Sequence, residues 1–344
     1  MNEATPVEAD KPATAPAEPA APAVVPARTP RVALLWQKEN LGLYSNAPFD
    51  DLYKGVGHNN GNLAFVYAIG SHIGNPVKYL PWHATVEALQ KAADIIVIPC
   101  ANQIGNGTDL GVMADKLEEA KLPVVAIGLG AQADNFDQDV SVTEGTLRWA
   151  KVIASLAYGA EPNIYTRGAY TTEQLGKLGV GNARTGGCPS HFINPAPRLG
   201  QRIAASWPKD ILPRSISVAG GHQAWGKTRD VEHQLVSMMM DPWAPGQYVV
   251  QSMGDMIKIS RCEFDTIDPA VLENLRRHTV PHYTMDEFKV WCRNYARSFY
   301  DVPSWMDSLR RYDLTIGARY HGVALALQAE KMGVTVTIDS RTTE

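Results

Sequence analysis

The chain has 344 residues, of which 45% are hydrophobic and 20% are charged, and its formal net charge is -4. This length suffices for about two domains, each with a packed core. The slightly acidic balance argues against a nucleic-acid-binding protein, which would carry a strongly basic face. No apolar stretch approaches the roughly 20 residues that a membrane-spanning helix needs, so we do not expect the chain to cross a bilayer.

The first 30 residues are dominated by Ala, Pro, Glu and Val, with almost no large apolar side chains. They lack the compact apolar core of a secretory signal. A segment of this composition buries too little surface to offset the entropy lost on ordering. We therefore expect residues 1–30 to form a disordered tail.

Short apolar segments alternate with helical patterns between residues 31 and 195. This alternation is typical of βαβ units, in which helices cover both faces of a parallel sheet. Strands are expected at 32–36, 77–81, 95–98, 124–127 and 163–166, and helices at about 61–71, 85–92, 111–120, 143–156 and 171–178.

The alternation pauses over residues 191–212, a stretch with several prolines and little periodicity, and then restarts. The pause indicates a domain boundary. The sequence thus predicts an α/β protein of two Rossmann-like, doubly wound domains, over 31–195 and 196–344. Because the chain stops directly after a predicted strand, we expect the natural protein to be longer. In the second domain, strands are expected at 215–219, 248–252, 298–302, 314–317 and 334–338, and helices at about 229–239, 269–277, 285–297, 304–311 and 322–331.

Ligands of doubly wound sheets bind at the carboxyl ends of the strands, so the loops there are candidate sites. The first candidate loop precedes the first helix and contains His58, Asn59, Asn60 and Asn62. Its Asn and Gly residues can leave backbone N–H groups available to an anion or a hydroxyl. Helix capping alone is an equally acceptable interpretation.

A second loop contains Gly128, Gly130 and Gln132 and superficially matches G-x-G-x-x-A. A dinucleotide fingerprint requires the helix to begin at once, and residues 134–137 intervene here. We therefore expect no nicotinamide binding. The glycines are better explained by a close approach of the backbone to a ligand or to a neighbouring strand.

Arg167 follows the strand predicted at 163–166. An arginine at a strand end is placed to meet an anion, although a surface ion pair with an acidic side chain explains it equally well.

The most informative segment contains Gly317, Arg319, Tyr320, His321 and Gly322, between a strand and a helix. The helix N-terminus supplies free N–H groups and the positive end of the helix dipole. Arginine offers a planar fork that matches carboxylate or phosphate, and histidine exchanges protons near neutral pH. The loop is thus a candidate for anion binding combined with acid–base chemistry, and a purely structural histidine in a tight turn is the alternative.

The sequence predicts no metal site. Pro281 interrupts any helix between His278 and His282, and the acidic residues at 134–139 lack the spacing of a calcium loop. None of the four cysteines belongs to a C-x-x-C pair, so we expect reduced and mostly buried thiols.

Taken together and in order, these segments resemble the polysaccharide pyruvyl transferase family from about residue 31 to residue 344. The most specific part of the resemblance is the G-x-R-x-H-G loop around Arg319 and His321. The other matching segments are 57–62, 127–130, 165–167 with Leu175 and Gly179–Val180, Gly187–Ser190 and Asp339–Glu344.

The resemblance implies a glycosyltransferase-B-like arrangement, with a cleft between the two domains. It implies that phosphoenolpyruvate donates a pyruvyl group to a sugar, forming a ketal without a further cofactor. It makes His321 the catalytic residue and Arg319 and Arg167 donor-binding residues, with Gly317 and Gly322 beside them. The second domain would bind the donor. The first would contact the acceptor, through residues 58–62 and 128–132.

The resemblance also implies an acceptor on a polysaccharide or a lipid-linked precursor, and a cytoplasmic protein with possible peripheral contact at the inner membrane face. Two other functions are compatible with the same architecture. One is a nucleotide-sugar-dependent glycosyltransferase, and the other is a non-catalytic glycan-binding or assembly protein.

Overall fold

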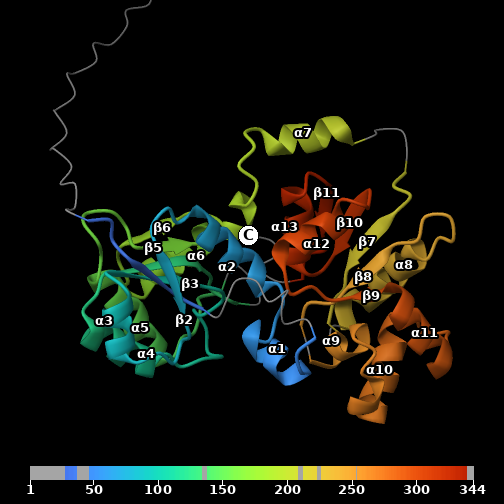
Figure 1. Cartoon of the computed structure of the whole chain (residues 1–344), viewed down its shortest axis with the longest axis horizontal. Coiled ribbons are helices and arrows are strands. Elements are labelled where there is room, and N and C mark those ends of the chain that lie inside the picture. Colours follow the sequence, from blue (N-terminus) through green and yellow to red (C-terminus); the bar gives the residue numbers. More distant parts are fainter. Residues whose placement is uncertain are drawn as a thin grey trace, which may run out of the picture.

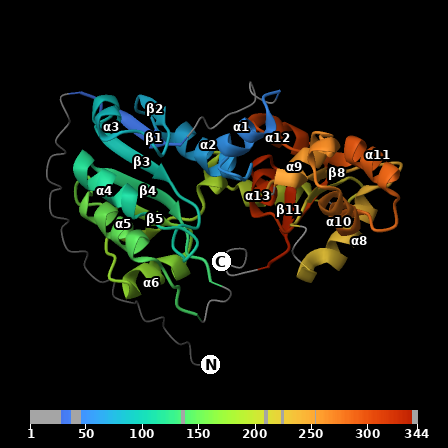
Figure 2. The same cartoon turned by 90° about the horizontal axis from the view of Figure 1, so that it is seen from below.

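The computed structural model describes residues 28–36, 46–133, 138–207, 212–222, 226–252 and 254–338, except for the side chain of residue 227. It contains two parallel sheets that lie side by side, each flanked by helices (Figures 1 and 2). This confirms the predicted fold class. Of the tail expected over residues 1–30, residues 1–27 lie outside the described residues. Arg28 is described and pairs with Asp94 at 2.8 Å.

The first sheet has six strands in the order β2-β1-β3-β4-β5-β6, all parallel. The order reverses between β1 and β3, which is where doubly wound sheets bind ligands. The central strands are apolar along their whole length because helices cover both faces. The strands are β1 (Val32–Leu35), β2 (Val77–Leu80), β3 (Ile95–Pro99), β4 (Val124–Leu129), β5 (Ile164–Thr166) and β6 (Ala183–Thr185).

Alternate residues of the first sheet face different helices. One face packs against α3 (Val86–Ala92), α4 (Gly111–Ala120), α5 (Glu144–Ser155) and α6 (Ala169–Lys177). The other face packs against α2 (Asn62–His72), through a small cluster centred on Phe65. The helix starts are set locally, because Thr85 and Thr143 each accept a hydrogen bond from the backbone N–H three residues later.

The second sheet has five parallel strands in the order β11-β10-β7-β8-β9. Side-chain caps start three of its helices, at Asp268, Thr284 and Asp301. Its strands are β7 (Ile216–Ala219), β8 (Gln247–Val249), β9 (Ala296–Arg297), β10 (Leu314–Gly317) and β11 (Met332–Thr335). Its helices are α8 (Arg229–Met239), α9 (Gly254–Ser260), α10 (Pro269–Thr279), α11 (Met285–Tyr295), α12 (Val302–Leu309) and α13 (Tyr320–Gln328), with short 3-10 turns η3 (Gly226–Thr228) and η4 (Phe264–Thr266).

Two segments connect the halves of the molecule. Helix α1 (Phe49–Gly55) precedes most of the first sheet in sequence but packs in the core of the second, as do Leu63 and Ala64 at the start of α2. A 3-10 helix, η2 (Pro189–Phe192), packs against both α2 and α13. Just after it, the backbone N–H of Asn194 donates to Gln328 Oε1 at 2.7 Å. Helix α2 and η2 therefore hold the two sheets in a defined relation.

Some predicted elements were wrong. The strand expected at 298–302 is instead a loop that joins the two-residue β9 to α12, and Asp301 caps that helix by accepting a hydrogen bond from Ser304 N at 2.6 Å. The last strand begins at Met332 rather than at residue 334 and ends at Thr335. Elements that were not predicted include α1, β6, α9, η2 and α7 (Leu199–Ser206), the last of which lies in the proline-containing stretch at 191–212.

No helix among the described residues is long and apolar enough to cross a membrane.

A buried polar network around Glu232 lies beside the core of the second sheet, near the carboxyl ends of its strands. The Glu232 carboxylate accepts hydrogen bonds from Gly221 N, at 3.1 Å to each oxygen, and from the Tyr248 hydroxyl. His278 Nε2 lies 3.2 Å from Glu232 Oε1, without the geometry of a hydrogen bond. Burial and the adjacent Glu232 carboxylate raise the pKa of Tyr248, so its hydroxyl stays protonated and donates.

Replacing Glu232 by alanine is expected to destabilise the fold, because it orphans the buried Gly221 N–H and the Tyr248 hydroxyl. Each orphaned group costs about 1–3 kcal/mol, or roughly 2–6 kcal/mol together, measured as the free energy of unfolding in urea. Glu118→Ala is the control, since it breaks only an exposed ion pair with Arg148 and should cost less than about 1 kcal/mol. Equal losses in the two variants would contradict this account.

Candidate functional site

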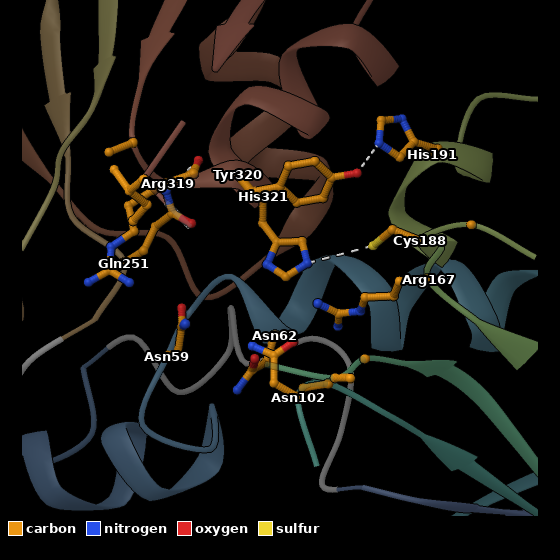
Figure 3. Close-up of a pocket in the computed structure, with 16 residues that line it drawn as sticks. Asn59, Asn62, Asn102, Arg167, Cys188, His191, Gln251, Arg319, Tyr320 and His321 are labelled. Carbon is orange, nitrogen blue, oxygen red and sulfur yellow. Dashed lines mark hydrogen bonds between the residues drawn. The ribbon is translucent and has the colours of Figure 1, made fainter. Parts of the chain in front are cut away.

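The carboxyl ends of both sheets open onto one cavity of about 340 Å³ (Figure 3). From the first sheet, the loops after β3, β4, β5 and β6 line the cavity, together with the segment that leads into α2. From the second sheet, residues that follow β8, β10 and β11 complete it. The cavity therefore lies where doubly wound sheets are expected to bind ligands.

Six of the residues predicted as site residues line this cavity. They belong to both halves of the molecule, and the first and last of them are more than 250 residues apart in the sequence, so the fold brings them together. They are Asn59, Asn62, Gly130, Arg167, Arg319 and His321.

The structure places His58, Asn60 and Gln132 outside the cavity lining. His58 is exposed, and its ring packs on Tyr53 with the centroids 4.7 Å apart. Asn60 is buried and donates from Nδ2 to the Phe299 carbonyl at 2.7 Å. Gln132 is exposed. The predicted loop at 58–62 thus divides its residues between the cavity and the packing around it.

The three remaining predicted glycines, Gly128, Gly317 and Gly322, also lie outside the lining and permit close packing behind it. Gly317 has φ of 154°, and a Cβ there would lie 2.2 Å from the Ala219 carbonyl oxygen. A Cβ on Gly322 would lie 2.7 Å from Gln251 Nε2. These glycines let β10 and α13 approach β7 and Gln251, and so place the residues between them.

His321 is held between the two halves of the molecule. It lies in the first turn of α13, and its ring is 5.7 Å from the Phe65 ring of α2. Its Nε2 lies 3.8 Å from Cys188 Sγ, at the start of η2. A Cβ on Gly61 would lie 3.0 Å from His321 Nδ1, so a larger residue there would crowd the imidazole. The side chain is thus fixed by contacts from α2 and η2.

Arg167 is fixed from the first sheet. Its Nε donates to the Gly128 carbonyl at 2.7 Å, and its Nη2 donates to the Cys100 carbonyl at 3.0 Å. Its guanidinium carbon lies 5.3 Å from the centre of the Phe65 ring. In the described part of the chain, backbone carbonyls rather than an acidic side chain hold it. Its full positive charge therefore remains available to a ligand in the cavity.

Five polar residues of the lining were not predicted as site residues, namely Asn102, Cys188, His191, Gln251 and Tyr320. His191 and Tyr320 form a hydrogen bond between η2 and α13. Burial lowers the pKa of His191, which keeps its imidazole neutral, and burial raises the pKa of Tyr320. The resemblance included Gly187–Ser190 and Tyr320 without giving either a role, and only the fold shows that they line the site.

The polar groups of the cavity match an anionic ligand beside hydroxyl groups. Two arginines and two histidines line the cavity, and no carboxylate occurs among its described lining residues. Asn62 and Asn102 lie next to one another in the cavity, and Asn59 lies on the segment before α2, which bridges to Ser252 of the second half (Figure 3). Carboxamides both donate and accept hydrogen bonds, as hydroxyl ligands require. No group of three or more potential metal-ligating side chains gathers anywhere in the described ranges.

Three solved structures are similar to this chain at a low level. The UDP-GlcNAc 2-epimerase from Methanocaldococcus jannaschii is 11% identical with a TM-score of 0.39, over 87% of this chain and 81% of its own. The S. aureus MnaA-UDP co-structure is 8% identical with a TM-score of 0.41, over 91% and 86%. A putative UDP-N-acetylglucosamine 2-epimerase from Listeria monocytogenes is 9% identical with a TM-score of 0.36, over 84% and 74%. These values carry no implication for substrate or activity.

No curated protein matches the chain. The model of one protein family, described as polysaccharide pyruvyl transferase, matches residues 35–340. The matched range includes every residue that lines the cavity and all strands of both sheets except the start of β1. The chain therefore belongs to the polysaccharide pyruvyl transferase family.

Proposed function

We propose that the enzyme transfers a pyruvyl group from phosphoenolpyruvate to two hydroxyls of a sugar, forming a pyruvate ketal and releasing phosphate. The sugar belongs to a polysaccharide or to its lipid-linked precursor. The observation that carries this proposal is the composition of the cavity. Arg319 and Arg167 enter it from facing sheets, His321 lies between them in Figure 3, and no carboxylate occurs among the described lining residues.

Donor binding follows from the two arginines. Phosphoenolpyruvate carries a carboxylate and a phosphate on a three-carbon frame, and its binding requires the neutralisation of adjacent negative charges. A guanidinium matches either group with two parallel hydrogen bonds. Arg319, at the N-cap of α13, and Arg167, after β5, supply one such fork from each half of the molecule. The start of α13 adds the positive end of a helix dipole on the same side as Arg319.

The acceptor sugar is placed against the carboxamides. Asn59 and Asn62 are oriented by contacts outside the cavity, since Asn59 Oδ1 accepts from Gly61 N at 2.9 Å and Asn62 Nδ2 donates to the Val56 carbonyl at 3.0 Å. With Asn102 they present a polar, uncharged wall to a ligand with several hydroxyls. His321 lines the same cavity as these carboxamides, and its proposed role is to exchange a proton with a hydroxyl bound there.

The reaction joins these groups in two steps. In the first, an acceptor oxygen bonds to C2 of phosphoenolpyruvate, its proton passes to His321, and the C2–C3 π electrons bind a proton at C3. In the second, the C2–O bond to phosphate breaks and phosphate leaves with the bonding pair. The second hydroxyl then bonds to C2 and loses its proton. No cofactor other than the co-substrate phosphoenolpyruvate is required. We place the reaction in the cytoplasm, at the inner membrane face where the acceptor is lipid-linked.

Thermal unfolding with candidate donors tests the donor assignment. A ligand at 100 times its dissociation constant stabilises the folded state by about 2.7 kcal/mol, which gives a measurable rise in Tm. We expect this rise with phosphoenolpyruvate and not with UDP- or GDP-sugars. A rise only with a nucleotide sugar would indicate a glycosyltransferase instead, and no rise with saturating phosphoenolpyruvate would contradict the proposed donor.

A further inference from the structure

We propose that Cys188 is a second catalytic residue, whose thiol delivers the proton to C3 of phosphoenolpyruvate while His321 accepts the proton of the attacking hydroxyl. This inference rests on the proposed function and extends it. It gives a chemical role to the Cys188–His321 contact, which lies inside the cavity and which donor binding does not use.

The thiol is paired with the imidazole across the join between the two halves of the molecule. Cys188 follows β6 and begins η2, whereas His321 belongs to α13, 133 residues later. Cys188 Sγ lies 3.8 Å from His321 Nε2 and 3.1 Å from Ser190 Oγ. Both side chains line the cavity, and Figure 3 shows the thiol pointing at the imidazole.

Several contacts keep this pair together. On the side of the first sheet, the N–H groups of Gly186 and Gly187 both donate to the Thr166 carbonyl, at 2.9 and 3.1 Å. Beyond η2, Asn194 donates from Nδ2 to the Gln328 carbonyl of α13 at 3.0 Å. Cys188 is therefore placed by a segment attached to both sheets, which fixes its distance from His321.

The reaction requires two proton-transfer groups, and few side chains of the cavity lining can act as one. Addition of a hydroxyl across C2=C3 needs a base for the hydroxyl and an acid for the methylene carbon. Arginine does not give up its proton, and amide side chains do not exchange theirs at useful rates. The Tyr320 hydroxyl is hydrogen-bonded to His191, whereas the Cys188 thiol contacts His321, the proposed base. Cys188 is therefore the acidic side chain of the described lining that is paired with the proposed base.

Cys188 and His321 together account for every proton that moves in the addition step. When the acceptor oxygen bonds to C2, the π electrons take the thiol proton at C3, and the hydroxyl proton moves to the imidazole. The result is a thiolate and an imidazolium in contact. Transfer of the proton from His321 to Cys188, across the observed 3.8 Å contact, restores the neutral pair. No oxidant, reductant or outside proton donor is consumed in this step.

Steady-state kinetics of Cys188→Ser and Cys188→Ala test the role. We expect each variant to lose about 10²–10⁴-fold in kcat, with little change in the dissociation constant of phosphoenolpyruvate measured by calorimetry. Serine keeps the size and hydrogen bonding of the site but is a far weaker acid. A serine variant with near-normal kcat would therefore overturn the proposal. Cys262→Ser, at an exposed cysteine away from the cavity, is the matched control and should retain full activity.

The stereochemistry of protonation gives a second readout that packing alone does not change. Wild-type enzyme acting on (Z)-[3-²H]phosphoenolpyruvate in tritiated water should give ketal methyl groups of one predominant configuration, because a fixed acid protonates one face of C3. The residual activity of Cys188→Ala should give a mixture, because water then supplies the proton. Unchanged stereochemical purity in the alanine variant would overturn the role of Cys188. Failure of the wild type to bind phosphoenolpyruvate in the thermal-unfolding test would instead overturn the proposed function itself.

Discussion

Replacing His321 by alanine is expected to lower turnover by about 10²–10⁴-fold, the usual contribution of a positioned acid or base. The reason is geometric. The imidazole is held between α2 and η2, with the Phe65 ring 5.7 Å from its own ring and Cys188 Sγ 3.8 Å from Nε2. It can therefore meet a hydroxyl bound against the carboxamide wall without a rearrangement. Donor affinity should change little, because the charges that bind phosphoenolpyruvate reside on the arginines.

Measurement of kcat and of the dissociation constant of phosphoenolpyruvate in the same preparation separates these effects. His83→Ala provides the control, since His83 is exposed, precedes α3 and lies outside the cavity lining. Near-normal turnover of His321→Ala would remove His321 from the mechanism. If Cys188 and His321 act as a unit, the double variant should lose hardly more turnover than the worse single variant, because residues that act together are strongly non-additive.

The sequence predicts best those strands whose two faces are both buried. Strands such as β3 and β4 are short apolar segments because both of their faces are covered, and that pattern is visible in any sequence. β6 has no such pattern, since its three residues are largely exposed and it takes its conformation from pairing with β5. The strand predicted at 298–302 was wrong because α12 starts within this segment. The start depends on the hydrogen bond that the Asp301 side chain accepts from Ser304 N, which the sequence alone does not reveal.

The sequence also locates much of the site, for a topological reason. Because all strands of each sheet are parallel, their carboxyl ends gather at one edge, and this identifies Arg167, Arg319 and His321 without knowledge of the packing. The contacts of Cys188 and His191 could not be predicted, since they depend on η2 lying between α2 and α13. Likewise, sequence adjacency does not show that Asn59 lines the cavity while Asn60 donates to Phe299.

Replacing Arg319 by alanine is expected to weaken phosphoenolpyruvate binding by roughly 10- to 150-fold. This follows from the loss of about 1.5–3 kcal/mol for a charged hydrogen-bonding group, taken as a tenfold change in affinity per 1.4 kcal/mol. The start of α13 should be retained, because the Arg319 side chain makes no capping hydrogen bond to that helix. Arg319→Lys should fall between alanine and the wild type, since it retains the charge but loses the planar fork.

Calorimetric titration with phosphoenolpyruvate measures this loss, and Arg310→Ala is the matched control, since Arg310 only pairs with Asp307 on the exposed surface of α12. Arg167 is a less direct test of donor binding, because its Nε and Nη2 also hold the Gly128 and Cys100 carbonyls. Removing it would loosen the loops after β3 and β4 as well as the donor. Unchanged affinity in Arg319→Ala would thus leave the donor bound by the first sheet alone, and it would contradict a mechanism in which the two sheets share its two negative charges.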